Sequence, residues 1–109
     1  MPRLKTVKET EEGGRKAVAV DKDIKAANVV RLRRIEGQIR GIQKMVDEDR
    51  YCADILAQVS AAQEALRAVG RELIRNHLKH CSTHAIRAGG EEAAAMYDEL
   101  VQLFDRNYR

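Results

Sequence analysis

The chain contains few of the residues that interrupt helices or mark a membrane segment. Its 109 residues include no tryptophan, three tyrosines and one phenylalanine, whereas Ala, Leu, Ile and Val recur at helical spacing. The single proline is Pro2, so no proline breaks a helix beyond that point. No run of 18 apolar residues and no apolar N-terminal segment occurs, a pattern that predicts neither a membrane span nor a secretory signal. We therefore expect an all-α protein in the cytoplasm.

Cysteine is also scarce. Cys52 and Cys81 are the only two, and in a chain expected in the cytoplasm they argue against a structural disulfide. They are then reactive thiols, metal ligands or small core residues. The sequence shows no nucleophile, base and orienting group at a spacing that suits catalysis, so we do not expect an enzyme.

Apolar periodicity divides the chain into a tail and one domain. Residues 1–20 mix charged residues with Gly-Gly and have no apolar period, which predicts a flexible N-terminal tail. Residues 21–109 form the predicted single helical domain. Its first helix begins between Asp21 and Asn28 and ends near Asp47. The apolar seam of this helix, spaced alternately by three and four residues, is Leu32, Ile35, Ile39, Ile42 and Val46.

A second, very long helix follows. Asp49 is its candidate cap, and Gly89-Gly90 should end it after roughly 35 residues. The same spacing as in the first helix predicts an antiparallel hairpin of the two. A short third helix should run from Glu91 to about Asp105, and association of chains should cover the seam left exposed. The apolar residues of the second helix are Ile55, Val59, Ala62, Leu66, Val69 and Leu73, and those of the third are Ala93, Met96, Leu100, Leu103 and Phe104.

Positive charge gathers on the first two helices. The net charge is +3 and the pI is about 9.0, which favours a polyanionic partner. A row of basic residues on a helix is often only a solvated face, and here Glu64 and Glu72 would be its ion-pair partners. The alternative is that they contact the phosphates of DNA. The candidate DNA-binding residues are Arg31, Arg33, Arg34 and Arg40 in the first helix and Arg67, Arg71 and Arg75 in the second.

The two cysteines and the first histidine suggest a site shared by two subunits. His77 and Cys81 are four residues apart, which makes them neighbours on one helix face. Cys52 lies 25 residues before His77, or about 37 Å along a helix that rises 1.5 Å per residue. An antiparallel dimer could place Cys52 of one chain beside His77 and Cys81 of the other. Two thiolates and an imidazole suit Cu(I) or Zn(II); zinc prefers a fourth ligand, which His80 or His84 would have to supply.

Three stretches of the chain closely resemble the copper-sensitive operon repressor (CsoR) family of small bacterial regulators. They are Leu32 to Ile42 (LRRIEGQIRGI), Met45 to Cys52 (MVDEDRYC) and His77 to Cys81 (HLKHC). The likeness extends from Val30 to Gly90, over half of the chain. It implies a three-helix protomer whose antiparallel hairpins form a four-helix-bundle dimer, with two dimers making a homotetramer. It further implies a repressor that binds operator DNA without a helix-turn-helix motif.

The same resemblance implies roles for particular residues. Cys52 of one subunit, with His77 and Cys81 of another, would bind Cu(I) in a trigonal arrangement. Cu(I) binding would then release the metal-free tetramer from its operator and derepress copper-resistance genes. Tyr51 and a glutamate of the third helix would act around the metal, the glutamate being Glu99, with Glu92 as the alternative.

Relatives in this family sense other signals, and their ligand positions differ. The nickel or cobalt branch has histidine where Cys81 stands and another near the N-terminus, whereas this chain has no histidine before His77. The persulfide branch lacks the histidine at position 77, and the formaldehyde branch lacks the second thiol. Copper fits best. A thiol-based sensor of persulfide or formaldehyde on the same scaffold is the alternative, and a copper-buffering protein is a third hypothesis.

Overall fold

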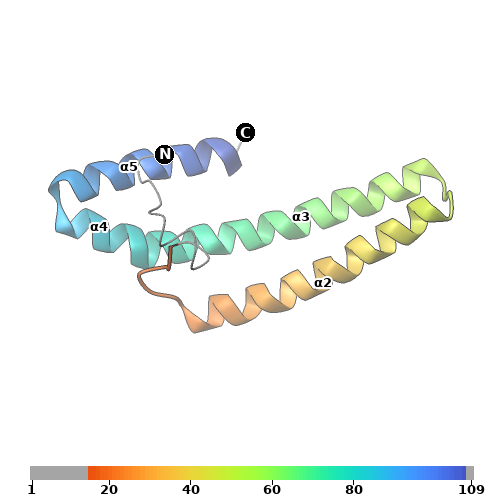
Figure 1. The fold of residues 1–109 in the computed structure, drawn as a ribbon, viewed down its shortest axis with the longest axis horizontal. Coiled ribbons are helices and arrows are strands. Elements are labelled where there is room, and N and C mark those ends of the chain that lie inside the picture. The colour runs from red at the N-terminus through yellow and green to blue at the C-terminus, as the bar shows by residue number, and fades with distance from the viewer. Residues whose placement is uncertain (1–14, 108–109) are drawn as a thin grey trace. The chain divides into compact units, whose positions relative to one another are not determined.

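The computed structural model describes residues 15–107, and within them every regular element is a helix. The helices are α2 (Lys22–Asp47), α3 (Cys52–Asn76), the π-helical segment η1 (His77–Ser82), α4 (Thr83–Ala88) and α5 (Gly90–Asn107) (Figure 1). The predicted all-α fold is thus confirmed. None of the described helices is long and apolar enough to cross a membrane. Most of the predicted tail, residues 1–14, lies outside the described residues.

The described chain forms two compact units. One is the hairpin of residues 21–73; the other combines residues 15–20 with residues 74–107. The α3 helix begins in the first unit and ends in the second. We call the first unit the hairpin and the second the C-terminal unit.

Local hydrogen bonds fix both ends of α2. The carboxylate of Asp21 accepts from the backbone N–H groups of Asp23 and Ile24 at 2.9 and 3.1 Å, which caps the helix start. At the other end Asp49 adopts a left-handed φ of 55°. The Arg50 N–H then reaches the Met45 carbonyl at 2.9 Å, a Schellman closure of α2. The prediction that Asp49 caps the following helix is therefore wrong: it closes the preceding one.

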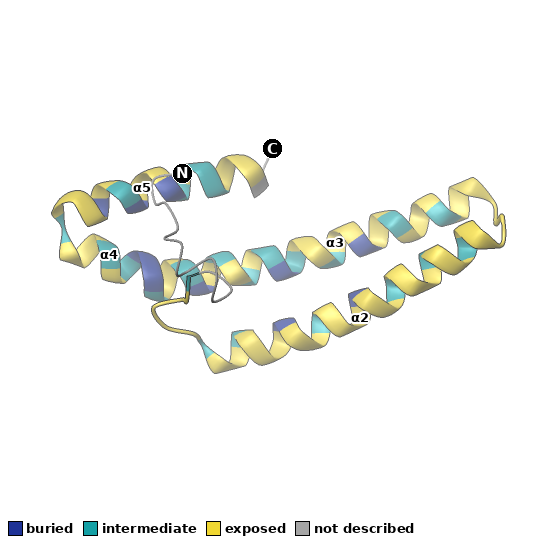
Figure 2. Ribbon diagram, viewed as in Figure 1, coloured by how far each residue is buried: buried dark blue, intermediate teal, exposed yellow. Residues whose placement is uncertain are grey.

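Within the hairpin, α2 and α3 run antiparallel, as the matching apolar spacing predicted (Figure 1). Ile35 of α2 and Ala62 and Val69 of α3 are buried. Other residues of the same seam are exposed, including Leu66 at 46% and Leu73 at 56%. Figure 2 shows that exposed residues predominate along α2 and α3. Burial of one such leucine contributes about 1.5–3 kcal/mol. A single chain therefore leaves part of its apolar seam exposed to solvent, as predicted from the sequence.

The long second helix changes its hydrogen-bonding pattern near its end. Helical backbone continues from α3 through η1 into α4 and ends at Gly89, whose φ of 74° suits glycine. The π-helical segment η1 contains His77, His80 and Cys81. Sequence spacing did not predict it. π-Helical turns are rare and often occur at functional sites.

In the C-terminal unit, α5 turns back along α4 (Figure 1). Its residues Met96 and Glu99 contact η1 through hydrogen bonds. Ala93 and Met96 of α5 are buried, as the apolar spacing predicted, whereas Phe104 is 41% exposed. Ser82 is also buried, and its hydroxyl donates to the sulfur of Met96 at 3.3 Å. The core of this unit thus combines apolar side chains with a few paired polar groups.

Candidate metal centre

His77 is held by a carboxylate from another helix. As the first residue of η1, it places Nε2 3.1 Å from Oε2 of Glu99 in α5. Glu99 is only 4% exposed. An ionised carboxylate only accepts hydrogen bonds, so a neutral imidazole here donates from Nε2–H. The lone pair of Nδ1 is then available to a metal, the usual arrangement for a metal-binding histidine oriented by a carboxylate.

Of the two glutamates considered from sequence, only Glu99 has a contact with His77 in the described hydrogen bonds. Glu92 is exposed and lines a cavity of about 420 Å³ beside Cys81. The structure thus brings together His77 and Glu99, two of the residues named from sequence. The part that Glu99 plays around a metal stays a prediction.

The second oxygen of Glu99 has a partner that sequence analysis missed. Arg15 Nη2 lies 3.3 Å from Glu99 Oε1. Arg15 belongs to the segment predicted to be a flexible tail, and nothing in its local sequence pointed to a carboxylate 84 residues away. Only the fold could have identified it.

Cys81 is a buried free thiol in η1, and Cys52 is an exposed free thiol at the start of α3. The cavity beside Cys81 is also lined by Val18, His84 and Met96. Among residues 15–107, no three His, Cys, Asp or Glu side chains are grouped so that one chain could hold a metal ion. Three such ligands are therefore not brought together within the described part of a single chain.

Tyr51 immediately precedes α3 and is 74% exposed. Its carbonyl accepts from the N–H groups of Asp54 and Ile55 at 3.0 and 3.2 Å, which closes the first turn of the helix. The backbone of Tyr51 thus has a structural role at the start of α3. The role of its side chain beside a metal stays a prediction.

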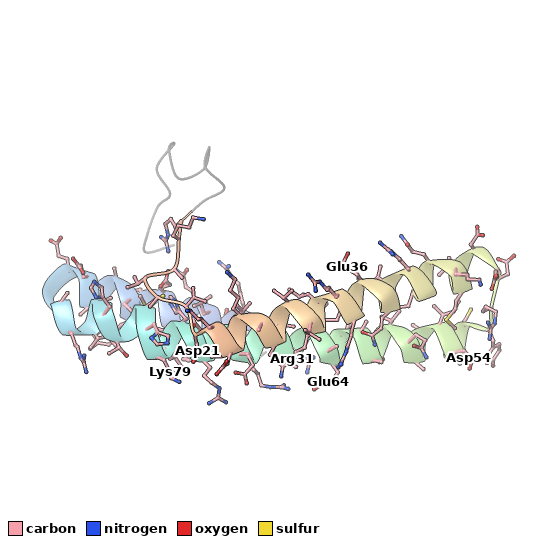
Figure 3. The ribbon with its side chains drawn as sticks, turned by 90° about the horizontal axis from the view of Figure 1, so that it is seen from below. Asp21, Arg31, Glu36, Asp54, Glu64 and Lys79 are labelled. Carbon is pink, nitrogen blue, oxygen red and sulfur yellow. The ribbon has the colours of Figure 1, made fainter. Side chains whose placement is uncertain are left out.

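Most of the candidate DNA-binding arginines are exposed. Arg31, labelled on α2 in Figure 3, is the exception. It is partly buried, and its Nη1 donates to Oδ1 of Asn28 at 3.2 Å. Arg71 lies 3.8 Å from Glu64, but both side chains are more than half exposed, so solvent screens the pair and it contributes little. The arginines that are exposed are Arg33, Arg34, Arg40, Arg67, Arg71 and Arg75.

A family model described as a metal-sensitive transcriptional repressor matches residues 24–106. The chain belongs to this family. Transcriptional repressors are not an enzyme class, and they act by binding operator DNA. The CsoR-type resemblance found in the sequence is therefore confirmed at the level of the family.

Two similar proteins are named as copper-sensing transcriptional repressors. The chain is 51% identical over 77 residues to the copper-sensing transcriptional repressor CsoR of Bacillus subtilis, covering 70% of this chain and 73% of that protein. It is 54% identical over 63 residues to the copper-sensing repressor RicR of Mycobacterium tuberculosis, covering 58% of this chain and 66% of that protein. The aligned segment is thus just under two thirds of the second relative's length.

Solved structures agree with the fold. The Cu(I)-containing crystal structure of CsoR from Geobacillus thermodenitrificans matches with a TM-score of 0.74 and 42% identity, over 84% of this chain and 94% of that one. The nickel-responsive regulator InrS matches with a TM-score of 0.58 and 34% identity, over 81% of this chain and 97% of that one. The match to the copper-sensing protein has the higher TM-score and the higher sequence identity.

Proposed function

We propose that this protein is a Cu(I)-sensing transcriptional repressor, in which the metal-free protein binds operator DNA and Cu(I) lowers that affinity. The observation that carries the proposal is the hydrogen bond from His77 to Glu99. It leaves Nδ1 available on a histidine that shares the η1 segment with the thiol of Cys81. The relatives named as copper sensors support the choice of metal.

The ligands of the proposed site are His77 and Cys81 of one chain and Cys52 of a partner chain. Two thiolates and one imidazole fit Cu(I), a soft ion that favours sulfur. Bound Cu(I) would supply a soft centre that joins the ligands of two chains. Within one chain, Cys52 begins α3 and His77 follows its last residue, 25 positions later. We therefore expect an antiparallel dimer, and the family resemblance implies that two dimers form a homotetramer.

The exposed arginines supply the DNA-binding part of the proposal. Phosphate contacts by arginines release counterions, so affinity for the operator should fall steeply with added salt. The coupling between metal and DNA requires that Cu(I) favour an assembly that binds DNA less well. Coupling free energies of this kind are typically about 1–3 kcal/mol, and a decisive switch needs more. We expect the protein to act in the cytoplasm and to have no catalytic activity.

The test is an anaerobic Cu(I) titration of the reduced protein against a competing chelator. The variants are Cys52→Ala, His77→Ala and Cys81→Ala, and Arg87→Ala is the control because Arg87 is an exposed residue of α4 outside the ligand set. One tight Cu(I) per subunit, weakened by the first three substitutions and unchanged by the control, supports the site. Tight binding that is indifferent to Cys52→Ala contradicts it.

The repressor part is tested separately. Operator duplexes are selected from a random library with metal-free protein, and binding is followed by fluorescence anisotropy with and without Cu(I). Release by Cu(I) supports the proposal. Mass spectrometry after sulfide or formaldehyde treatment is run in parallel: release from DNA by a covalent thiol adduct but not by Cu(I) would replace the copper proposal with the thiol-based sensor.

A further inference from the structure

The N-terminal segment of residues 15–20 contacts the residues around His77 at three places. Arg15 pairs with Glu99 at 3.3 Å. The Ala19 carbonyl accepts from Nδ2 of Asn76, the residue before His77, at 3.1 Å. Val18 lines the cavity beside Cys81. These contacts all fall within the C-terminal unit, so the segment is part of the packing of that unit.

Glu99 is the residue through which Arg15 can affect His77. Its side chain is 5% exposed, and its two oxygens are divided between two partners: Oε1 faces Arg15 and Oε2 faces His77. A buried carboxylate is costly unless hydrogen bonds and an opposite charge compensate it. Arg15 supplies that charge, and its side chain is 23% exposed, less than a typical surface arginine.

The guanidinium group also has a geometric effect. Its Nη2 donates to Oε1 of Glu99 in a charge-assisted hydrogen bond, which restrains rotation of the carboxylate. With Oε1 held by Arg15, Oε2 stays directed at the imidazole of His77. Loss of Arg15 would leave the carboxylate free to rotate, and His77 would lose the restraint that keeps Nδ1 directed away from Glu99.

We infer that Arg15 is a positioning residue for the metal centre, which acts through Glu99 on the orientation of His77. The inference rests on the proposed Cu(I) site and extends it to a residue outside the family match at 24–106. It also gives the described end of the N-terminal tail a function: it completes the set of residues that orient a metal ligand. Arg15 itself does not touch the metal.

The experiment measures Cu(I) affinity of the full chain by chelator competition for Arg15→Ala, Arg15→Lys and the control Lys16→Ala. Lys16 is the adjacent basic residue and is exposed. Partners of a metal-bound histidine typically contribute 10–100-fold to metal affinity, and Arg15, one step further out, should contribute about tenfold. Arg15→Lys should recover part of this loss because it keeps the charge but not the planar geometry, and Lys16→Ala should match the unmodified protein.

A double-mutant cycle with Glu99→Gln separates positioning from general destabilisation. If Arg15 acts only through Glu99, Arg15→Ala should cost little more in the Glu99→Gln background. Additive losses in the cycle, or equal losses for Arg15→Ala and Lys16→Ala, would overturn the inference. Unchanged Cu(I) affinity in Arg15→Ala, with the Cys52 and Cys81 dependence intact, would overturn it and leave the proposed function standing. If Cys52→Ala and Cys81→Ala leave Cu(I) affinity unchanged in a protein that retains Arg15, both the inference and the proposed function are overturned.

Discussion

The hairpin and the C-terminal unit are built on different principles. In the hairpin, two long helices present a repeated apolar seam, and most charged side chains project into solvent. In the C-terminal unit the helix becomes π-helical, two glycines in succession have positive φ, and the buried polar residues Asn76, Ser82 and Glu99 have hydrogen-bond partners. The hairpin thus follows a periodic pattern that is visible in the sequence, whereas the C-terminal unit contains hydrogen bonds between residues far apart in the chain.

This difference corresponds to the two halves of the proposed function. A DNA backbone is a repeating polyanion, and a regular helical surface with spaced arginines suits it. A metal ligand needs a defined orientation, which requires a buried partner such as Glu99. The proposed metal site uses both kinds of structure. Cys52, from the hairpin of one chain, would bind the same ion as His77 and Cys81 of another chain.

The largest expected effect is the loss of Cu(I) affinity when one of the proposed cysteine ligands is removed. Cys52→Ala and Cys81→Ala should each lower Cu(I) affinity by more than about 100-fold, because ligand loss exceeds the 10–100-fold cost of losing an outer partner. A mixture of the two variants, refolded together, should regain tight binding, because each mixed dimer has one complete site in an isologous interface. Chelator competition on the mixture measures this. No recovery in mixed dimers would show that the ligands do not come from two chains.

The next effect tests the buried carboxylate. Glu99→Gln should lower Cu(I) affinity by about 10–100-fold, because an amide does not orient the imidazole of His77 as an ionised carboxylate does. Metal-free DNA affinity should be unchanged, since the exposed arginines are untouched. The matched control is Glu92→Gln, an exposed glutamate of the same helix. Equal losses for the two variants would contradict a special role for Glu99.

Two glycines should respond in opposite directions. Gly89→Ala should lower the free energy of unfolding by about 1–3 kcal/mol, because φ 74° with ψ −171° is a conformation that only glycine adopts readily. Gly37→Ala in α2 should raise it by up to about 1 kcal/mol, since nothing lies within 4 Å of the added methyl group and alanine favours helix. Thermal melting followed by circular dichroism gives both values. A destabilising Gly37→Ala would instead locate a close contact with another chain at that face.

The smallest effect concerns DNA. Arg34→Ala, a change of an exposed arginine of α2, should weaken operator binding across sequences and reduce the slope of log affinity against log salt by about 1, as expected for one lost phosphate contact. Arg87→Ala, an exposed arginine of α4, is the control and should leave the slope unchanged. Anisotropy titrations at several salt concentrations provide the comparison. The same slope for Arg34→Ala as for the unmodified protein would remove Arg34 from the DNA-binding surface.

The sequence predicted the regular elements well for a physical reason. The 3,4 spacing of Leu32, Ile35 and Ile39 is sufficient to indicate α2, since an amphipathic helix repeats every 3.6 residues. Gly89-Gly90 indicated the end of the long helix because helices often end at a residue with positive φ, which glycine adopts readily; both glycines have positive φ in the structure. Asp49 was placed at the wrong helix because the same short polar residue suits an N-terminal cap and a left-handed C-terminal turn.

For the candidate site, residue spacing identified His77 and Cys81 as neighbours and indicated that a site that also uses Cys52 would have to be built across two chains. Spacing could not choose between Glu92 and Glu99, because the choice depends on how α5 packs against η1. It also gave no indication of Arg15, which lies 84 residues from its partner.

The amino-acid sequence by itself therefore determined the helices, their amphipathic faces and the set of soft metal-binding side chains. These follow from local periodicity and residue chemistry. The burial of Glu99 between His77 and Arg15 was decided by tertiary structure alone. It requires segments far apart in the chain to meet in a desolvated environment, where an unpaired charge is costly and one arrangement of partners is strongly preferred.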